Sequence, residues 1–479
     1  MLPVIRSDEH LYTVPKFDLG KGDVKDFMNE LNGFHEQFAD CFHRSESREH
    51  FFNYMAGQFS ELERKSIEPI ALAIKDGNVR AMQRFVSDAQ WDDNNIIAKY
   101  RNCVNDDLGS PDGALIFDES GFLKKGQDSI GVGRQYCGTA GKVDNCQVGV
   151  FAAYVSENGY ALVDKRLFIP QQWFTDEYRA RRKKCNLPED TVFRTKPQLA
   201  AEMLQTIHEE NTLPFKYVPG DSIYGISPEF IETVDTLPSI TYLVSAPKNT
   251  LCWLKRPMSI AKQYRWGGKT KTKTVLTDTD SKPIAVSHLA KNINDYFWYR
   301  RQVSEGAKGP IVYEFTRRRV VLSAAGLPEK TVWLLIRRTI GDDPQYSFFI
   351  SNASSSTRLK TLVWLSGMRW AIEQCFEETK SELGMDHYEV RKFMGWRHHI
   401  LTCMLAHFFL WHLKIRMGKK APSITLSQLR ILLKLLLPMR KHSLDTLIEQ
   451  VIWIQDRNHR AYLSHRKRRL RELNKDRTK

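Results

Sequence analysis

The 479-residue chain has no uninterrupted apolar run long enough to cross a membrane. A membrane-spanning helix needs about 18 consecutive apolar residues, and the longest apolar stretch, near Ile400–Trp411, is broken by Thr402 and His407. The N-terminus also lacks the apolar segment of a signal peptide, because charged residues begin at Arg6. We therefore expect a soluble, intracellular protein.

Cysteine pairs of the CxxC type are absent as well. The eight cysteines are scattered along the chain, and the nearest approach to a zinc-ligand pattern is Cys403 with His407. Both residues lie in the apolar stretch that we expect in the core. The simplest interpretation is a set of reduced, mostly buried thiols in a reducing compartment, without a zinc site.

Motifs for nucleotides and for zinc proteases are incomplete or missing. Gly138–Val143 resembles a Walker A motif, but Tyr136 stands where its first glycine belongs and Val143 replaces the Ser or Thr after the lysine. Tyr136 also interrupts a GxGxxG pattern that would begin at Gly131, and no HExxH occurs. We therefore expect neither ATP nor a nicotinamide cofactor.

Positive charge is concentrated in two segments. The chain carries 71 Lys and Arg against 56 Asp and Glu, a net charge of +15, and the segment 457–479 contributes +8 of it. A second stretch contains no acid and is interleaved with Trp253, Tyr264 and Trp266; its basic residues are Lys255, Arg256, Lys262, Arg265, Lys269, Lys271 and Lys273. Cations neutralise phosphates and aromatic rings stack on bases.

Each basic segment alone is equally consistent with a bland interpretation, a solvated β-hairpin and a frayed basic tail. Together they favour a nucleic-acid partner. An anionic membrane would more naturally bind an amphipathic basic helix.

The residue patterns predict an α/β protein, and 42% hydrophobic residues are enough to bury a core. Helical spacing in residues 22–105 is typical of a helix-turn-helix-like unit or of any small helical bundle. Beyond Gly113, three strand-like runs precede a helix, a strand, a helix and a strand, an order that suits an RNase H-like core. The strand-like runs are Ala114–Phe117, Gln147–Tyr154, Ala161–Phe168, Phe215–Val218 and Ile240–Ser245.

A β-rich region and further helices follow. Short aromatic and β-branched runs such as Tyr296–Tyr299 and Ile311–Phe315 predict strands, and the helical period returns from Leu362. We predict a helical N-terminal DNA-binding domain, a first part of the catalytic core, a β-rich insertion, a core segment with a helix that carries an acid, and a helical C-terminal region with a basic tail. Their bounds are 1–106, 107–250, 251–360, 361–415 and 416–479.

Two aspartates follow apolar runs at expected strand ends. Asp118 and Asp221 each have a glycine close by in the sequence. Carboxylates at strand ends that face a crevice suit a hard cation such as Mg²⁺. Asp and Gly are also common in ordinary turns, so the two positions are candidates for a site and nothing more at this point.

A third candidate acid lies on a helix that we expect to begin near Met368. Arg369, Glu373, Glu377 and Lys380 share one face of this helix by their spacing. Most such faces are exposed surfaces with ion pairs between successive turns. The functional interpretation is a metal-binding carboxylate flanked by cations that grip phosphate.

At these places the sequence resembles the DDE transposases of bacterial insertion sequences, in particular the insertion sequence 701 group of DDE superfamily endonucleases. The resemblance extends from about residue 20 to about residue 415. The matching blocks are Phe117–Phe122 with Lys124–Gly126, Arg134–Thr139 through Asn145–Gln147, Gly220–Asp221 with Tyr224–Gly225, and Arg369–Glu373 with Lys380 and Leu383–Arg391. A related signature has Tyr, two residues, Arg, three residues, Glu, six residues and Lys. Arg369, Glu373 and Lys380 fit this spacing, and Ser366 occupies the Tyr position.

The resemblance implies a site and a fold. Asp118, Asp221 and Glu373 would be the catalytic carboxylates and would bind two Mg²⁺ or Mn²⁺ ions, while Arg369 and Lys380 would neutralise phosphate. The fold would be an RNase H-like core with a β-rich insertion between the second and third acids. An aromatic residue of such an insertion supports a flipped base in related enzymes; the candidates are Trp253, Trp266, Trp298 and Trp333.

The implied function is that of an insertion-sequence transposase in the bacterial cytoplasm, associated with the nucleoid. Such an enzyme binds terminal inverted repeats, cuts double-stranded DNA and transfers the 3′-hydroxyl ends to target DNA, as a homodimer and without a membrane or nucleotide cofactor. We expect further DNA contacts from the two basic segments, at Lys255, Arg256, Arg265, Trp266, Lys269, Lys271, Arg466, Lys467, Arg468 and Arg469.

Two other functions stay open. A metal-dependent DNA endonuclease that cuts without joining would keep the same three acids. A catalytically silent DNA-binding protein derived from a transposase is the other alternative, and the presence of all three acids argues against it.

Overall fold

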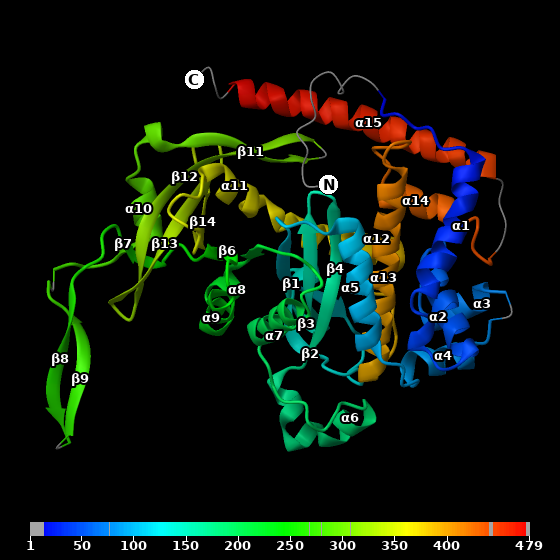
Figure 1. The fold of residues 1–479 in the computed structure, drawn as a ribbon, viewed down its shortest axis with the longest axis horizontal. Helices are drawn as coiled ribbons and strands as arrows, with labels where there is room; N and C mark the ends of the chain where they lie inside the picture. The colour runs from blue at the N-terminus through cyan, green and yellow to red at the C-terminus, as the bar shows by residue number, and fades with distance from the viewer. Residues whose placement is uncertain are drawn as a thin grey trace. The chain divides into compact units, whose positions relative to one another are not determined.

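The computed structural model describes residues 14–75, 77–267, 269–278, 280–306, 308–439 and 444–475. They form two compact units (Figure 1). The first unit contains the described residues up to Phe215 together with Trp370–Ser464, and the second contains Lys216–Arg369 and the described residues from His465. Each unit contains helices and strands, which confirms the predicted α/β class.

The N-terminal part of the first unit is a helical bundle with an aromatic interior. Phe34 packs against Phe409 with ring centroids 5.5 Å apart, and Phe51 packs against Phe42 at 4.9 Å. The structure confirms the helices predicted between residues 22 and 105. They are α1 (Lys21–Glu36), η2 (Ala39–Cys41), α2 (Ser45–Gln58), α3 (Ile67–Ala73), α4 (Val79–Ser87) and α5 (Asp93–Leu108).

The sheet of the first unit is antiparallel. Its central strand β3 pairs with β1 on one side and with β2 and β4 on the other. The strands are β1 (Ala114–Leu123), β2 (Gly133–Cys137), β3 (Lys142–Ser156) and β4 (Gly159–Phe168). Three of the four were predicted; β2 was missed because its polar residues give no clear apolar alternation.

Further helices complete the first unit. α7 begins at a capping box in which Thr195 and Gln198 exchange hydrogen bonds, as the predicted start near Thr195 required. Short elements connect the strands and α7: η3 (Gly138–Ala140), η4 (Gln171–Phe174), η5 (Asp176–Tyr178) and α6 (Arg179–Lys184). The longer helices are α7 (Lys196–Glu210), α12 (Trp370–Leu383), α13 (Phe393–Met417), α14 (Leu426–Leu433) and α15 (Leu444–Lys475), whose last residues belong to the second unit.

The described part of the basic tail is helical, so the alternative of a frayed tail does not hold there. Residues 457–475 continue α15, and residues 476–479 lie outside the described residues. An unbroken helix is possible here because the segment contains neither Gly nor Pro. The tail therefore no longer argues against a membrane surface, which an amphipathic basic helix would suit.

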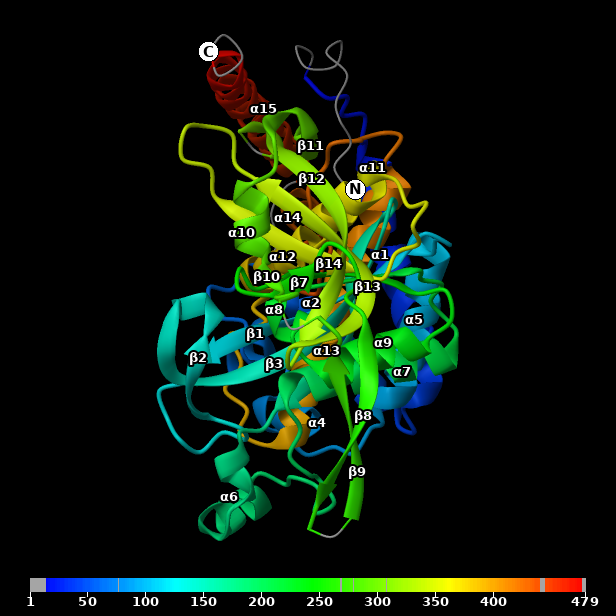
Figure 2. The ribbon, with the colours of Figure 1, turned by 90° about the vertical axis from the view of Figure 1, so that its left-hand side faces the viewer.

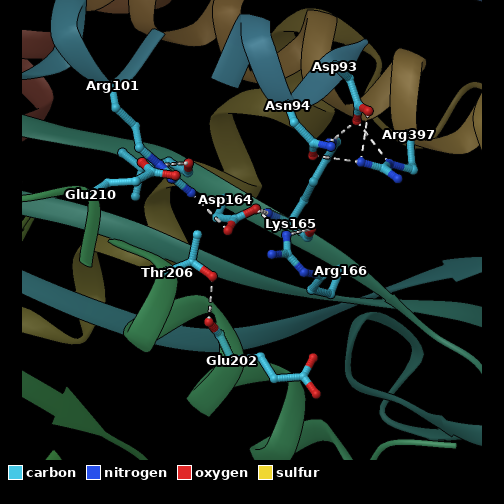
Figure 3. Close-up of polar contacts among 11 residues, drawn as sticks. Asp93, Asn94, Arg101, Asp164, Lys165, Arg166, Glu202, Thr206, Glu210 and Arg397 are labelled. Atoms are coloured by element: carbon cyan, nitrogen blue, oxygen red, sulfur yellow. Dashed lines mark hydrogen bonds and ion pairs between the residues drawn. The ribbon is translucent and has the colours of Figure 1, made fainter. Parts of the chain in front are cut away.

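Buried charges join the helices to β4. Lys165 lies beside Asp93 (Figure 3). Its Nζ is 2.8 Å from Asp93 Oδ2, and the two side chains are only 1% and 2% exposed. Arg397 Nη2 lies 2.8 Å from Asp93 Oδ1, and Arg101 Nη2 lies 2.9 Å from Asp164 Oδ2. Burial would raise the pKa of Asp93, but Lys165 and Arg397 outweigh it and hold that pKa below its ordinary value. These pairs fix α5 and α13 on β4, since a buried charge is tolerated only when it is paired.

The second unit contains a mixed sheet. β5 and β6 are parallel, and the remaining pairs are antiparallel in the order β10-β7-β12-β13-β14-β6, with β11 on β12. The strands are β5 (Tyr217–Gly220), β6 (Thr241–Ala246), β7 (Leu251–Trp253), β10 (Ile284–Ala285), β11 (Tyr299–Gly306), β12 (Gly309–Ala324), β13 (Leu327–Arg338) and β14 (Tyr346–Ser351). The helices are α8 (Ser222–Gly225), α9 (Pro228–Thr236), α10 (Val286–Lys291), η6 (Asp295–Phe297) and α11 (Leu359–Met368).

The predicted β-rich character of residues 250–360 is confirmed, with one local error. Tyr296–Tyr299 is not a strand, because Asp295–Phe297 forms η6 and β11 begins at Tyr299. Asn294 explains the turn, since its side chain accepts a hydrogen bond from the Tyr296 N–H. β8 (Ser259–Trp266) and β9 (Lys269–Leu276) form a separate two-stranded hairpin, which projects from the rest of this unit in both views (Figures 1 and 2).

All eight cysteines are free thiols, and every one except Cys41 is buried, as predicted. None of the helices in the described ranges is long and apolar enough to span a membrane.

Candidate active site

Asp118 lies in the middle of β1, so the prediction that it ends a strand was wrong. β1 continues to Leu123, five residues further. The strand persists because Asp118–Leu123 keeps its register with β3, from Asp118 opposite Phe151 to Leu123 opposite Cys146. The carboxylate is half-buried, and Oδ1 accepts a hydrogen bond of 2.8 Å from the Glu119 N–H.

The register of β1 decides which face of the sheet Asp118 points to. Directly paired residues of antiparallel strands point to the same face, and Phe151, the partner of Asp118, packs against Phe376 of α12 at 5.2 Å. Glu119 points to the opposite face, where its Oε1 lies 2.8 Å from Nζ of Lys196 on α7. Asp118 therefore faces α12, and its acidic neighbour faces α7.

Glu373 lies on α12, one helical turn before Phe376. Its side chain is exposed, whereas Ile372 and Phe376 on the adjoining face are buried. The structure therefore brings Asp118 and Glu373 to the same face of the β1–β3 pair within the first unit. This arrangement follows from the helical period, which puts the apolar stripe on the sheet and leaves Glu373 beside it.

The inner side of α12 is held by a polar group. Glu378 Oε2 lies 2.8 Å from His407 Nε2 of α13, and its Oε1 accepts a hydrogen bond of 3.0 Å from the Tyr160 hydroxyl of β4. Burial and the neighbouring Glu378 carboxylate raise the pKa of Tyr160, so the phenol stays a donor. These contacts fix the rotation of α12 about its axis, and with it the direction of Glu373.

Lys380 donates hydrogen bonds to two residues of the first unit. Its Nζ donates to the backbone oxygen of Gly121 at 3.0 Å and to Thr139 Oγ1 at 2.9 Å. Burial lowers its pKa. In this arrangement Lys380 joins α12 to β1 and η3, in addition to any contact with phosphate.

Asp221 and Arg369 meet in the second unit. Asp221 follows β5 directly, as predicted, and its Oδ1 caps α8 by accepting from the Ile223 N–H at 2.8 Å. Arg369 Nη1 lies 3.8 Å from Asp221 Oδ2. α11 ends at Met368 and α12 begins at Trp370, so Arg369 lies between two helices and not inside the predicted single helix.

The three acids match the predicted metal in donor chemistry. Carboxylate oxygens are the hard ligands that Mg²⁺ and Mn²⁺ prefer, and Asp118, Asp221 and Glu373 are half-buried or exposed. Across the described ranges, no cluster of three or more His, Cys, Asp or Glu forms a ready-made metal site. Asp118 and Glu373 belong to the first unit and Asp221 to the second.

The sequence blocks that carry the resemblance converge around Tyr388. The Tyr388 hydroxyl donates to Gln147 Oε1 at 2.9 Å, and Lys124 Nζ lies 3.4 Å from the centre of the Tyr388 ring. Asn145 Nδ2 donates to the backbone oxygens of Lys124 and Gly126. Burial lowers the pKa of Lys124 to about 8. These polar residues therefore join β1, β3 and the segment after α12 in the first unit.

The predicted DNA-contact residues differ in their surroundings. Lys255, Lys467 and Arg468 are exposed, and Arg469 is half-buried. Arg256 donates to the backbone oxygen of Glu329. Arg466 Nε lies 3.5 Å from Glu305 Oε1, with only 15% of the Arg466 side chain exposed. On the projecting hairpin, Arg265, Lys269 and Lys271 are exposed.

Three of the four candidate tryptophans are buried. Trp253 donates to the Ser281 backbone oxygen at 3.2 Å, and Trp333 donates to the Ser354 backbone oxygen at 2.8 Å. The third is Trp298, whose ring lies 4.2 Å from the Arg338 guanidinium. The side chain of Trp266 lies outside the described part of the chain.

An exposed aromatic residue next to the third acid was overlooked. Trp370 begins α12, three residues before Glu373, and 47% of it is exposed. Its ring packs edge-on against Tyr160 at 6.0 Å. The signal was present in the sequence, because Trp370 stands between Arg369 and Glu373 in the matched signature.

Comparison with known proteins identifies the family. The DDE superfamily endonuclease family matches residues 37–310, more than half of the chain. The chain belongs to this family. This DDE endonuclease is also 24% identical over 341 residues to the "Probable transposase for insertion sequence element IS701" of Microchaete diplosiphon. The match covers 71% of this chain and 76% of that protein. The predicted resemblance to the insertion sequence 701 group and the prediction of an enzyme are confirmed.

Among solved structures, the endonuclease is similar to a piggyBac transposase in a synaptic complex with hairpin DNA, determined by cryo-EM. The match covers 96% of this chain and 86% of that chain at 8% identity, with a TM-score of 0.38.

Proposed function

We propose that this DDE endonuclease is the transposase of a bacterial insertion sequence. It binds the terminal inverted repeats as a homodimer, cuts the DNA, and joins the 3′-hydroxyl ends to target DNA in the bacterial nucleoid. The observation that carries this proposal is the placement of Asp118 and Glu373 on one face of the first unit, in a chain of the DDE family. The similarity to an insertion-sequence transposase supports strand transfer in addition to cutting.

In this proposal Asp118, Asp221 and Glu373 hold two Mg²⁺ or Mn²⁺ ions within an RNase H-like core. When bound, such ions activate the attacking oxygen and stabilise the leaving oxygen of an in-line displacement at phosphorus. Arg369, whose guanidinium lies near Asp221, neutralises the phosphate with a planar donor fork. Lys380 holds α12 against β1 through Gly121 and adds positive charge near the cut.

The five predicted regions have corresponding roles in this proposal. The N-terminal helices (1–106), the basic part of the β-rich insertion (251–360) and the end of α15 bind DNA. The segments 107–250 and 361–415 carry the three acids. Trp370, exposed beside Glu373, stacks on a base near the cut, a role that suits an exposed aromatic ring.

The test is strand joining by the purified full chain. The reaction contains Mg²⁺, supercoiled plasmid and a labelled duplex with an exposed transposon end, taken from the DNA that flanks the gene. We expect labelled DNA joined to the plasmid. Glu373→Gln should abolish cutting and joining but spare DNA binding, because it changes charge at the metals and hardly changes shape.

Glu377→Gln is the matched control, because Glu377 is also exposed and lies one turn further along α12. This variant should cut and join at the wild-type rate. Cutting without joining would establish the nuclease alternative. Binding without either reaction would leave a catalytically silent DNA-binding protein, and normal cutting by Glu373→Gln would show that the third acid is another residue.

A further inference from the structure

The β8–β9 hairpin has two chemically different faces. Its register pairs Lys262 with Lys273, Tyr264 with Lys271, and Arg265 with Thr270. Side chains alternate between the faces of a strand, so the odd residues of β9 lie on one face and the even residues on the other. We call the first the lysine face; it contains Lys262, Tyr264, Lys269, Lys271 and Lys273. The opposite threonine face contains Ala261, Gln263, Arg265, Thr270, Thr272 and Thr274.

The lysine face is exposed and has no acid to balance it. The four lysines and Tyr264 are all exposed, and Tyr264 is 44% accessible. No Asp or Glu occurs between Lys255 and Lys273, and no acid of the described residues pairs with a lysine of this face. Lys262 stands directly opposite Lys273, and like charges in that position destabilise a hairpin. The face therefore carries a charge arrangement that costs stability in the free protein and that an anionic partner would relieve.

The dimensions of the face suit duplex DNA. Alternate residues of a strand lie about 6.8 Å apart, so Lys269, Lys271 and Lys273 span roughly 14 Å. Neighbouring strands are about 4.8 Å apart, and a two-stranded ribbon enters the major groove, which is about 12 Å wide. In that position the lysines reach phosphates on both sides while Tyr264 contacts base edges or sugars.

We propose that the lysine face of the β8–β9 hairpin docks on double-stranded DNA and that the threonine face stays in solvent. This inference rests on the proposed function for the identity of the polymer. It assigns Lys262 and Lys273 to the contact beside the predicted Lys269 and Lys271. It also excludes Arg265 from the predicted DNA contacts, because Arg265 lies on the threonine face.

The test moves charge from one face to the other at constant composition. The face-swap variant carries Lys269→Thr, Lys271→Thr, Lys273→Thr, Thr270→Lys, Thr272→Lys and Thr274→Lys. The amino-acid composition, the net charge and the strand propensity of β9 therefore stay the same. Wild type and variant are titrated with a fluorescent 25-base-pair duplex of unrelated sequence across a salt series. The swap removes the like-charge pair Lys262–Lys273 but places a lysine at position 270 opposite Arg265, so the thermal melting curves of the two proteins should coincide.

We expect the swap to weaken binding at least about tenfold at low salt. It should also reduce the slope of log affinity against log salt by about 3, because each phosphate contact contributes about 0.9 to that slope and three contacts are lost. Equal affinity and equal slope would overturn the proposal, since net charge alone would then explain binding. Both proteins are also titrated with vesicles that contain anionic lipids. If the face swap weakens binding to these vesicles but not to DNA, the DNA proposal is overturned in favour of a membrane partner.

The joining assay separates this inference from the proposed function. If the wild type joins ends and the face-swap variant binds DNA like the wild type, only the face assignment fails. If the wild type joins nothing but binding depends on the lysine face, the face assignment stands and the transposase proposal fails.

Discussion

Of the two neighbouring acids of β1, Asp118 should be essential for DNA cutting and Glu119 should not. Asp118 faces α12, which carries Glu373, while Glu119 faces α7 and pairs with Lys196. We therefore compare Asp118→Asn with Glu119→Gln. Both changes remove one negative charge from adjacent positions of the same strand and preserve the shape of the side chain, so each is the control of the other.

The structure gives different magnitudes for the two variants. The Glu119–Lys196 pair spans 2.8 Å with side-chain exposures of 17% and 20%, so its loss should cost about 1 kcal/mol of stability and change the cutting rate less than tenfold. Removing a metal-binding carboxylate forfeits several kcal/mol of transition-state stabilisation. A loss of about 4 kcal/mol for Asp118→Asn corresponds to roughly a thousandfold lower rate.

The assay is Mg²⁺-dependent cutting of a labelled duplex that contains a transposon end, with binding of the same duplex measured separately. Asp118→Asn should bind but not cut, and Glu119→Gln should do both. Loss of cutting by Glu119→Gln together with normal cutting by Asp118→Asn would show that the register argument chose the wrong face of β1.

Two further predictions concern the scaffold of the first unit. Asp93→Asn should lower the free energy of unfolding by about 3–5 kcal/mol, because it leaves buried Lys165 without a counterion beside Arg397. Lys165→Met should lower it less, because Asp93 still pairs with Arg397. Equal losses for the two variants in urea unfolding would contradict this difference. Burial would lower the pKa of His412, but its hydrogen bonds to Asp107 and Glu30 outweigh it and raise that pKa above 6.5. The free energy of unfolding of the wild type should therefore exceed that of His412→Gln most below pH 6.5, and the difference should shrink as pH rises through the folded-state pKa. A difference that does not change with pH would show that protonation of His412 does not contribute to stability.

Local patterns in the sequence were enough for the classes of structure and for the candidate acids. Helical spacing predicted the N-terminal bundle and the helix of Glu373, and alternating or apolar runs predicted most strands. These signals are local, because each element is stabilised by the face that its own residues bury. Glu373 could be singled out because its spacing to Arg369 and Lys380 lies within one segment, and Asp118 and Asp221 because each follows an apolar run.

The environment of these residues depended on partners that lie far away in the chain. Asp118 is in mid-strand and faces α12 only because β1 pairs with β3 in one register and Phe151 meets Phe376. Likewise, Arg466 is engaged by Glu305, a residue 161 positions earlier in the sequence. The lysine face needed the position of the hairpin turn, because a shift of one residue in register would exchange the faces of a strand. The sequence alone determined the family, most of the element types and the candidate acids. The tertiary structure decided which way each side chain points, because that direction is set by long-range pairing and packing that no local pattern contains.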